Sequence, residues 1–169
     1  KEMFTEELHR LPVFYQYPPI EEVPPVTALP AEQTGCITFG SFNNPAKVNY
    51  EVIGLWSEVI KLVPGSRLLL KFKNLYDQTS LRDSVVERFA ACGIGQDRVV
   101  FAGKLDTLKE HLRHYSEVDI SLDPFPFNGT TTTFQALWMG VPVVSLAGET
   151  FMSRAAGSIL HHLDLGELV

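Results

Sequence analysis

Four successive threonines, Thr130 to Thr133, are the run of side chains in this sequence that most clearly suits a chemical role. They follow the half-buried strand pattern of residues 118–122 and precede the short apolar run Phe134–Met139, which Gly140 closes. The threonines are therefore expected where a strand gives way to a helix. At a helix start the first N–H groups lack intrahelical partners and the macrodipole favours an anion. Hydroxyl groups there would add donors for a phosphate.

Helix capping is the simpler interpretation of these hydroxyls, but a cap needs only one Ser or Thr. Threonine is β-branched and a poor helix former, so four in a row exceed what a cap requires. The run by itself favours an anion site over a cap.

Lys47 and His111 are further candidates beside this run. Lys47 closes the polar stretch after the first expected strand and could meet a phosphate, although composition alone favours a solvated surface lysine. Asn43 and Asn44 in that stretch are more often turn formers than ligands. His111 lies near the apolar stripe of its expected helix, so a structural histidine is the default and stacking on a nucleotide base is the alternative.

The elements that must position these residues alternate between strands and helices. Helices are expected after an Asn49 cap, from a variant capping box at Ser80–Asp83, and after an Asp106 cap. Such spacing is typical of right-handed βαβ units and predicts a Rossmann-like α/β fold: a parallel sheet of about five strands with helices on both faces. Ligands then bind beyond the carboxyl ends of the strands, near the topological switch point. The expected strands are Cys36–Phe42, Ser66–Phe72, Arg98–Ala102, Val118–Leu122 and Pro142–Leu146.

The first 34 residues differ from the rest of the chain. Six of the eleven prolines lie there, whereas the strand and helix patterns begin at Cys36. We expect residues 1–34 to be an extended connector and residues 35–169 to be the Rossmann-like domain. A chain that begins with a connector is expected to be a fragment of a larger protein.

Composition excludes several classes of function. The net charge of −6 argues against a nucleic-acid partner, and no apolar run approaches the roughly 20 residues of a membrane span. The start lacks the apolar core of a signal peptide. The two cysteines, Cys36 and Cys92, have no disulfide or metal spacing, which favours a reducing, cytoplasmic location.

Several known fingerprints are missing. The sequence has neither GxGxxG after the first strand nor GxxxxGK[ST] anywhere. Asp119 and Asp123 are four residues apart and do not form a DxD motif, so no metal site is expected.

Five segments in succession resemble motifs of the O-GlcNAc transferase and SPINDLY-type glycosyltransferases. The similarity extends over about residues 1–169, and the four threonines are closest to bacterial and SPINDLY-like members. The resemblance implies the carboxyl-terminal, donor-binding lobe of a GT-B enzyme. The segments are Phe42–Lys47, Lys109–His111, Leu122–Thr133, Ala136–Val144 and Gly148–Arg154.

The resemblance also implies roles for single residues. Lys47 would meet the donor diphosphate and stabilise the leaving nucleotide as the catalytic group on this lobe, with Asn44 near the same group. His111 would stack against the base, and the turn near Leu105 and Asp106 would offer backbone groups to its edge.

In the threonine run, the resemblance implies that Thr131 and Thr132 bind the diphosphate, assisted by Thr130. Gln135 stands where the family has an acidic residue that binds the ribose hydroxyls. An amide accepts through one oxygen only, so this substitution bears on which nucleotide is bound.

By the same resemblance, the whole protein is expected to be an inverting, metal-independent enzyme that transfers GlcNAc from UDP-GlcNAc to Ser or Thr of proteins, with no further cofactor. The acceptor-side residues would lie in an amino-terminal lobe outside this chain, with TPR repeats upstream, and the isolated chain is expected to be inactive. The alternatives are a GDP-fucose-dependent enzyme, a non-catalytic nucleotide-binding module, and an epimerase of UDP-GlcNAc with Glu149 as its carboxylate.

Overall fold

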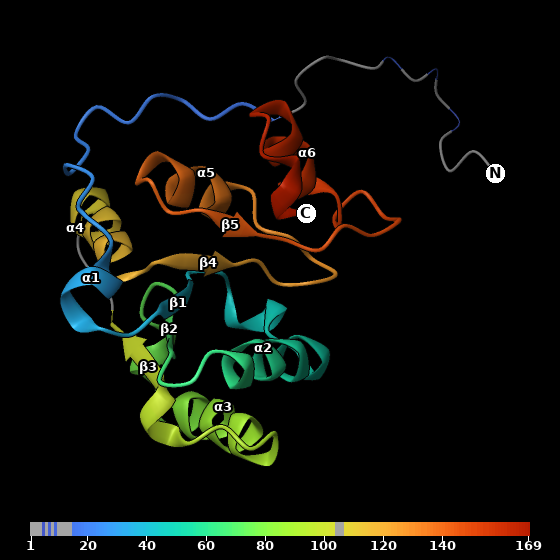
Figure 1. The fold of residues 1–169 in the computed structure, drawn as a ribbon. Coiled ribbons are helices and arrows are strands. Elements are labelled where there is room, and N and C mark those ends of the chain that lie inside the picture. Colours follow the sequence, from blue (N-terminus) through green and yellow to red (C-terminus); the bar gives the residue numbers. More distant parts are fainter. Residues whose placement is uncertain (1–4, 6, 8, 10–14, 104–106) are drawn as a thin grey trace.

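The computed structural model describes residues 5, 7, 9, 15–103 and 107–169. Its centre is a five-stranded parallel sheet in the order β3-β2-β1-β4-β5 (Figure 1). The strands are β1 (Thr38–Ser41), β2 (Arg67–Lys71), β3 (Val99–Ala102), β4 (Ile120–Leu122) and β5 (Val143–Val144). The expected α/β fold is therefore confirmed, with strands shorter than the sequence pattern suggested.

The helices alternate with these strands along the chain. They are α1 (Pro30–Thr34), α2 (Tyr50–Leu62), α3 (Thr79–Ala91), α4 (Leu108–Arg113), α5 (Thr131–Trp138) and α6 (Ala155–His162). Short 3-10 turns lie at Pro45–Lys47, Leu75–Asp77, Gln96–Arg98, His114–Glu117 and Gly166–Leu168. Among the described residues, no helix is both long and apolar enough to cross a membrane.

Two apolar layers cover the two faces of the sheet, because successive side chains of a strand point to opposite faces. In β2, Leu68 and Leu70 pack with α2 and α3, whereas Leu69 packs on the other side with α4, α5 and α6. Figure 1 shows α2 and α3 on one side of the sheet and α5 and α6 on the other. The second layer also includes Ile20 and Val23 of the connector.

The helix limits confirm one of the three expected caps. Asn49 caps α2, since its side chain accepts a hydrogen bond from the Val52 N–H. The variant capping box at Ser80 is wrong, because α3 begins one residue earlier and its N-cap, Gln78, makes no side-chain hydrogen bond. The cap of α4 is Thr107, which forms a complete capping box with Glu110; the expected Asp106 lies outside the described residues.

The connector differs from the expected extended segment at its end. Residues 30–34 form α1, which begins with a proline at its first position, as helices often do. The buried carboxylate of Asp119 anchors this helix by accepting hydrogen bonds from the Ala31 and Thr38 N–H groups, each at 2.8 Å. Upstream of α1, an ion pair between Glu22 and Lys109 ties the connector to α4. From residue 20 onward, the connector thus packs along the domain rather than standing apart from it.

Candidate functional site

The polar segments named by the sequence meet at the carboxyl edge of the sheet. The chain proceeds from β1 outward to β3, then crosses back to place β4 on the other side of β1. The strand order therefore reverses between β1 and β4, which is where sheets of this kind bind ligands. Phe42–Lys47 follows β1 at this point, and Asp123–Thr130 follows β4.

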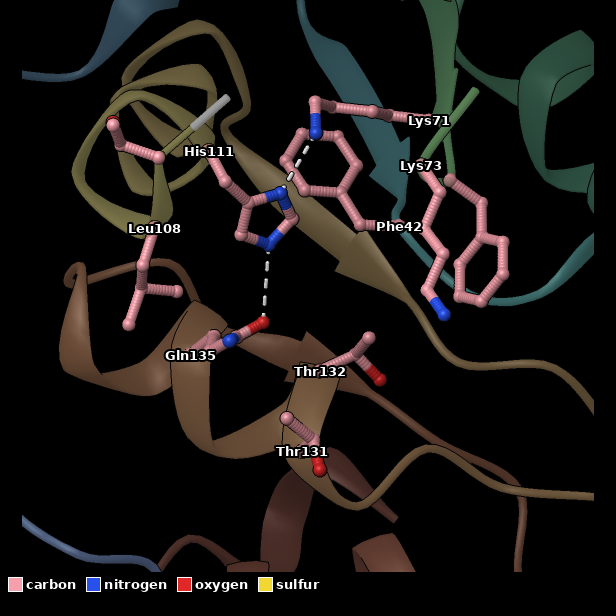
Figure 2. A pocket seen from close by; sticks show the side chains of 10 residues that line it. Phe42, Lys71, Lys73, Leu108, His111, Thr131, Thr132 and Gln135 are labelled. Atoms are coloured by element: carbon pink, nitrogen blue, oxygen red, sulfur yellow. Dashed lines mark hydrogen bonds between the residues drawn. The ribbon is translucent and has the colours of Figure 1, made fainter. Parts of the chain in front are cut away.

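A pocket of about 360 Å³ opens at this edge. Figure 2 shows its side chains converging from the ends of β1 and β2 on one side and from α4 and α5 on the other. Two aromatic rings and two lysines lie among them, so the pocket offers flat apolar surface together with positive charge. The lining residues are Phe42, Lys71, Phe72, Lys73, Thr107, Leu108, His111, Thr131, Thr132 and Gln135.

The four threonines lie in three different environments. Thr131 and Thr132 line the pocket, whereas Thr133 is buried and its hydroxyl has no partner among the described residues. Thr130 is the N-cap of α5, yet its side chain makes no capping hydrogen bond. The first bond of the helix joins the Phe134 N–H to the Thr130 carbonyl, so the N–H groups of residues 131–133 have no intrahelical acceptor. The run is therefore not explained by capping.

Asn43 is a site residue that the sequence reasoning treated only as a turn former. It is 5% exposed, and its Oδ1 accepts a hydrogen bond from the Thr132 hydroxyl at 3.0 Å. Asn44, the expected ligand beside it, instead accepts from the Ala46 N–H at 3.0 Å and caps the short 3-10 turn that carries Lys47. Asn44 thus acts here by shaping the turn.

Lys47 reaches from this turn to the loop after β4. Its Nζ donates to the Asn128 carbonyl at 2.8 Å and lies 4.2 Å from the centre of the Phe127 ring. Burial lowers the pKa of Lys47 below its usual value, while the nearby carboxylate of Asp123 acts in the opposite direction. An ammonium group has three hydrogens, so this lysine keeps donors beyond the one used for Asn128.

Asp123 is a second site residue that the sequence left without a role. It is 6% exposed, and its carboxylate accepts hydrogen bonds from the Gly129 N–H at 2.6 Å and the Ser145 hydroxyl at 2.8 Å. Burial raises its pKa to about 7, although these hydrogen bonds and the charge of Lys47 oppose the shift. The side chain thereby holds the loop that leads into the threonine run.

His111 and Gln135 lie side by side in the pocket. The Nε2 of His111 is 3.1 Å from Gln135 Oε1, and its Nδ1 is 2.7 Å from the Nζ of Lys71 (Figure 2). Lys71 is only 2% exposed at the end of β2. The sequence reasoning missed Lys71, because a lysine at the end of a strand carries no local signal for a partner 40 residues away.

Other expected features are placed as follows. Leu105 and Asp106 lie outside the described residues, so the expected backbone contacts to a base fall there too. Glu149, the carboxylate considered for an epimerase, is exposed and does not line this pocket. Across the residues with a described structure, no group of three or more His, Cys, Asp or Glu side chains is placed to hold a metal ion.

Taken together, the edge combines an ammonium group, threonine hydroxyls and free helix N–H groups with an aromatic-lined pocket. The first set suits a diphosphate and the second suits a nucleotide base. A Rossmann-like sheet with such an edge is typical of the nucleotide-binding half of a GT-B glycosyltransferase. The sequence model of glycosyl transferase family 41 matches residues 27–169, and the chain belongs to that family.

Individual relatives agree with this assignment. The chain is 42% identical over 98% of its length to a probable SPINDLY UDP-N-acetylglucosamine–peptide N-acetylglucosaminyltransferase from Oryza sativa subsp. japonica, and 33% identical over 79% of its length to a UDP-N-acetylglucosamine–peptide N-acetylglucosaminyltransferase from Caenorhabditis elegans. Among solved structures, an O-GlcNAc transferase mutant from Thermobaculum terrenum superposes with a TM-score of 0.83 at 30% identity, covering 89% of this chain and 28% of that one.

These relatives are much longer than this chain. The chain spans 18% of the length of the rice protein and 11% of that of the Caenorhabditis protein. The expectation of a larger protein is therefore supported, and the sheet and its edge are one part of it.

Proposed function

We propose that this chain is the nucleotide-sugar-binding lobe of a protein O-GlcNAc transferase that uses UDP-GlcNAc as donor and Ser or Thr of proteins as acceptor. The observation that carries the proposal is the meeting of Lys47, Thr131 and Thr132 at the switch point, beside the pocket that contains His111. The rice and Caenorhabditis relatives are named as UDP-N-acetylglucosamine–peptide N-acetylglucosaminyltransferases, which supports the choice of donor and acceptor.

In this proposal, the diphosphate lies against the start of α5. The Lys47 ammonium and the Thr131 hydroxyl donate to its oxygens, assisted by Thr130 and by the unpartnered N–H groups of the helix. The Thr132 hydroxyl joins them by giving up its bond to Asn43. The uracil enters the pocket beside His111, and Gln135 and Asn44 lie within the same site. Thr132 belongs both to the diphosphate position and to the base pocket. The nucleotide would therefore extend from the loop after β4 toward α4.

The chemistry follows from where charge develops. When an acceptor hydroxyl attacks the anomeric carbon from the face opposite the diphosphate, the bond to the diphosphate breaks and negative charge grows on its oxygens. Preorganised donors stabilise this charge more in the transition state than in the ground state. Lys47 and the α5 terminus would perform this role without a metal ion, and the configuration at the anomeric carbon would invert.

The rest of the enzyme belongs to the same proposal. The acceptor-side groups would come from an amino-terminal lobe, with TPR repeats further upstream, so the chain alone would bind donor without transferring sugar. A cytoplasmic location would fit the two cysteines, both of which are free thiols.

Calorimetry of the chain with UDP and with GDP tests the proposal. We expect measurable binding of UDP, weaker binding of GDP, and no transfer to a peptide by the chain alone. Selective binding of GDP would favour a GDP-fucose donor instead. A folded chain that binds neither nucleotide would refute the assignment of this lobe.

A further inference from the structure

Four polar side chains form one continuous chain of contacts through the pocket. It runs from Lys71 through His111 and Gln135 to Tyr17, with separations of 2.7 Å, 3.1 Å and 3.1 Å between the polar atoms. The members come from β2, α4, α5 and the connector, so four separate parts of the chain meet in this relay.

The charge of Lys71 sets the direction of the hydrogen bonds in the relay, although burial lowers the pKa of this lysine below its usual value. An ammonium group can only donate, so Lys71 requires the Nδ1 of His111 to accept. In a neutral imidazole the other nitrogen then carries the proton, and Nε2 donates to the Oε1 of Gln135. The amide nitrogen of Gln135 is left to donate to the Tyr17 hydroxyl.

Burial makes this arrangement costly to break. Lys71 and Gln135 are only 2% and 6% exposed, so a polar atom that loses its partner there would gain little from water. Around the imidazole lie Phe42, with ring centres 5.7 Å apart, and Tyr115, at 5.8 Å. Packing and hydrogen bonds therefore fix both the plane and the tautomer of the ring.

Burial and the charge of Lys71 also determine the protonation state of the imidazole. Burial, and then the positive charge of Lys71, lower the pKa of His111 to about 4. The hydrogen bond to Gln135 opposes this shift, and the charge of His114 adds to it; both are smaller influences. Among the described residues, Tyr115 also contacts the ring, and Lys73 lines the same pocket. His111 is thus neutral at physiological pH.

We propose that Lys71 is a positioning residue of the nucleotide pocket: its ammonium group holds His111 in the Nε2–H tautomer and, through Gln135 and Tyr17, fastens the connector to the same pocket. Ring stacking also holds Tyr17 in place: its ring centre lies 5.3 Å from that of Phe134 in α5, and the two ring planes are 18° apart. The inference rests on the proposed function, because it assigns a task to a residue of that site.

One consequence concerns how His111 meets a base. Both ring nitrogens are already used within the protein, so the base meets the face of the imidazole and forms no hydrogen bond with it. Gln135 likewise uses its amide oxygen to accept from His111 and its amide nitrogen to donate to Tyr17. Its first role here is to hold His111, in contrast to the ribose contact expected of an acidic residue at this position.

Imidazole ¹⁵N NMR of the chain, with histidine labelling, tests the relay without any ligand. In the unmodified chain we expect a single His111 tautomer with the proton on Nε2. In Lys71→Met, which keeps the length of the side chain but removes its donors, we expect a mixture of tautomers and a higher pKa of His111. Lys73→Met is the matched control, because it removes a lysine from the same pocket that has no bond to the ring.

The comparison of the lysine variants supports or overturns the proposal. A change in tautomer or pKa that appears in Lys71→Met and not in Lys73→Met supports the proposal, as does its recovery in Lys71→Arg, whose guanidinium is also only a donor. The proposal is overturned if the unmodified chain carries the proton on Nδ1, or if the Lys71→Met spectra match those of the unmodified chain. The measurement on the unmodified chain decides the tautomer even if a variant does not fold.

Binding of UDP and uridine extends the test to function. Lys71→Met should weaken both by a similar factor, about three- to tenfold for one net hydrogen bond, because its effect acts at the base. A loss confined to UDP would place Lys71 at the phosphates and contradict its role. If the unmodified chain bound neither compound, the proposed function would fail, while the NMR result would still stand for or against the relay.

Discussion

Lys47 and Asn128 join the two sides of the switch point: the Nζ of Lys47 lies 2.8 Å from the Asn128 carbonyl oxygen, across 81 residues of sequence. The bond ties the turn after β1 to the loop that leads into α5. It also holds the ammonium group beside the residues expected to meet a diphosphate.

Lys47→Ala should weaken binding of UDP about ten- to a hundredfold, since a hydrogen bond to a charged group contributes roughly 1.5–3 kcal/mol. Uridine binding should change little, because the lysine lies on the phosphate side. Calorimetry with both compounds measures the difference. Lys61→Ala is the control, as this exposed lysine forms an ion pair with Glu58 on α2. Equal losses for UDP and uridine would show that Lys47 does not lie at the phosphates.

Gly129→Ala should disturb the threonine run, because a methyl group there would collide with the Thr132 hydroxyl and come within 2.9 Å of Asp123 Oδ1. We expect a loss of stability of about 1–3 kcal/mol, typical of overpacking, together with weaker UDP binding. Urea unfolding and calorimetry measure the two effects.

Gly54→Ala gives a matched control for that substitution. Gly54 lies inside α2 and a methyl group there meets nothing within 4 Å. It should stabilise the chain by about 0.5–1 kcal/mol through helix propensity and leave UDP binding unchanged. If Gly129→Ala behaved like Gly54→Ala, the close packing of Gly129 against Thr132 and Asp123 would not matter for stability or UDP binding.

Gln135→Glu should raise the pKa of His111, because a carboxylate beside Nε2 stabilises the imidazolium more than an amide does. NMR titration of the His111 ring measures this shift. Gln96→Glu adds the same charge at an exposed position before β3 and should leave the titration unchanged. A titration of Gln135→Glu that matched the unmodified chain would mean that the contact between His111 and residue 135 is absent in solution.

The neutral state of His111 predicts a dependence of stability on pH. Its pKa is about 4 when folded and 6.5 for the unperturbed group, so between these values the unfolded chain binds more protons. The contribution of His111 to the free energy of unfolding should therefore decrease as pH falls from 6.5 to 4. Asp123, with its pKa raised to about 7, acts in the opposite direction over the same range.

The difference between the unmodified chain and His111→Gln isolates the histidine, because the Asp123 contribution is common to both. Urea unfolding at several pH values should show this difference shrinking toward low pH. A difference that stayed constant from pH 4 to 6.5 would mean that the folded pKa of His111 is not lowered.

Much of the fold was predictable because it depends on local patterns. The apolar period of α2 with its Asn49 cap, and the alternation in the strands, both follow from neighbouring residues. The prediction was wrong where a distant residue decides the local structure. Residues 30–34 were expected to be extended connector, yet they form α1, whose Ala31 N–H donates to Asp119, far along the chain.

For the site, the sequence by itself determined which segments reach the sheet edge, since a parallel βαβ order places every loop after a strand at the same end. The same order brings His111, Thr131, Thr132 and Gln135 to one pocket and Lys47 to the same edge of the sheet. Only the tertiary structure decided the partners of these residues. Lys71, His111, Gln135 and Tyr17 meet across separations of 40, 24 and 118 residues, because strand order and helix packing set their distances and no local pattern encodes them.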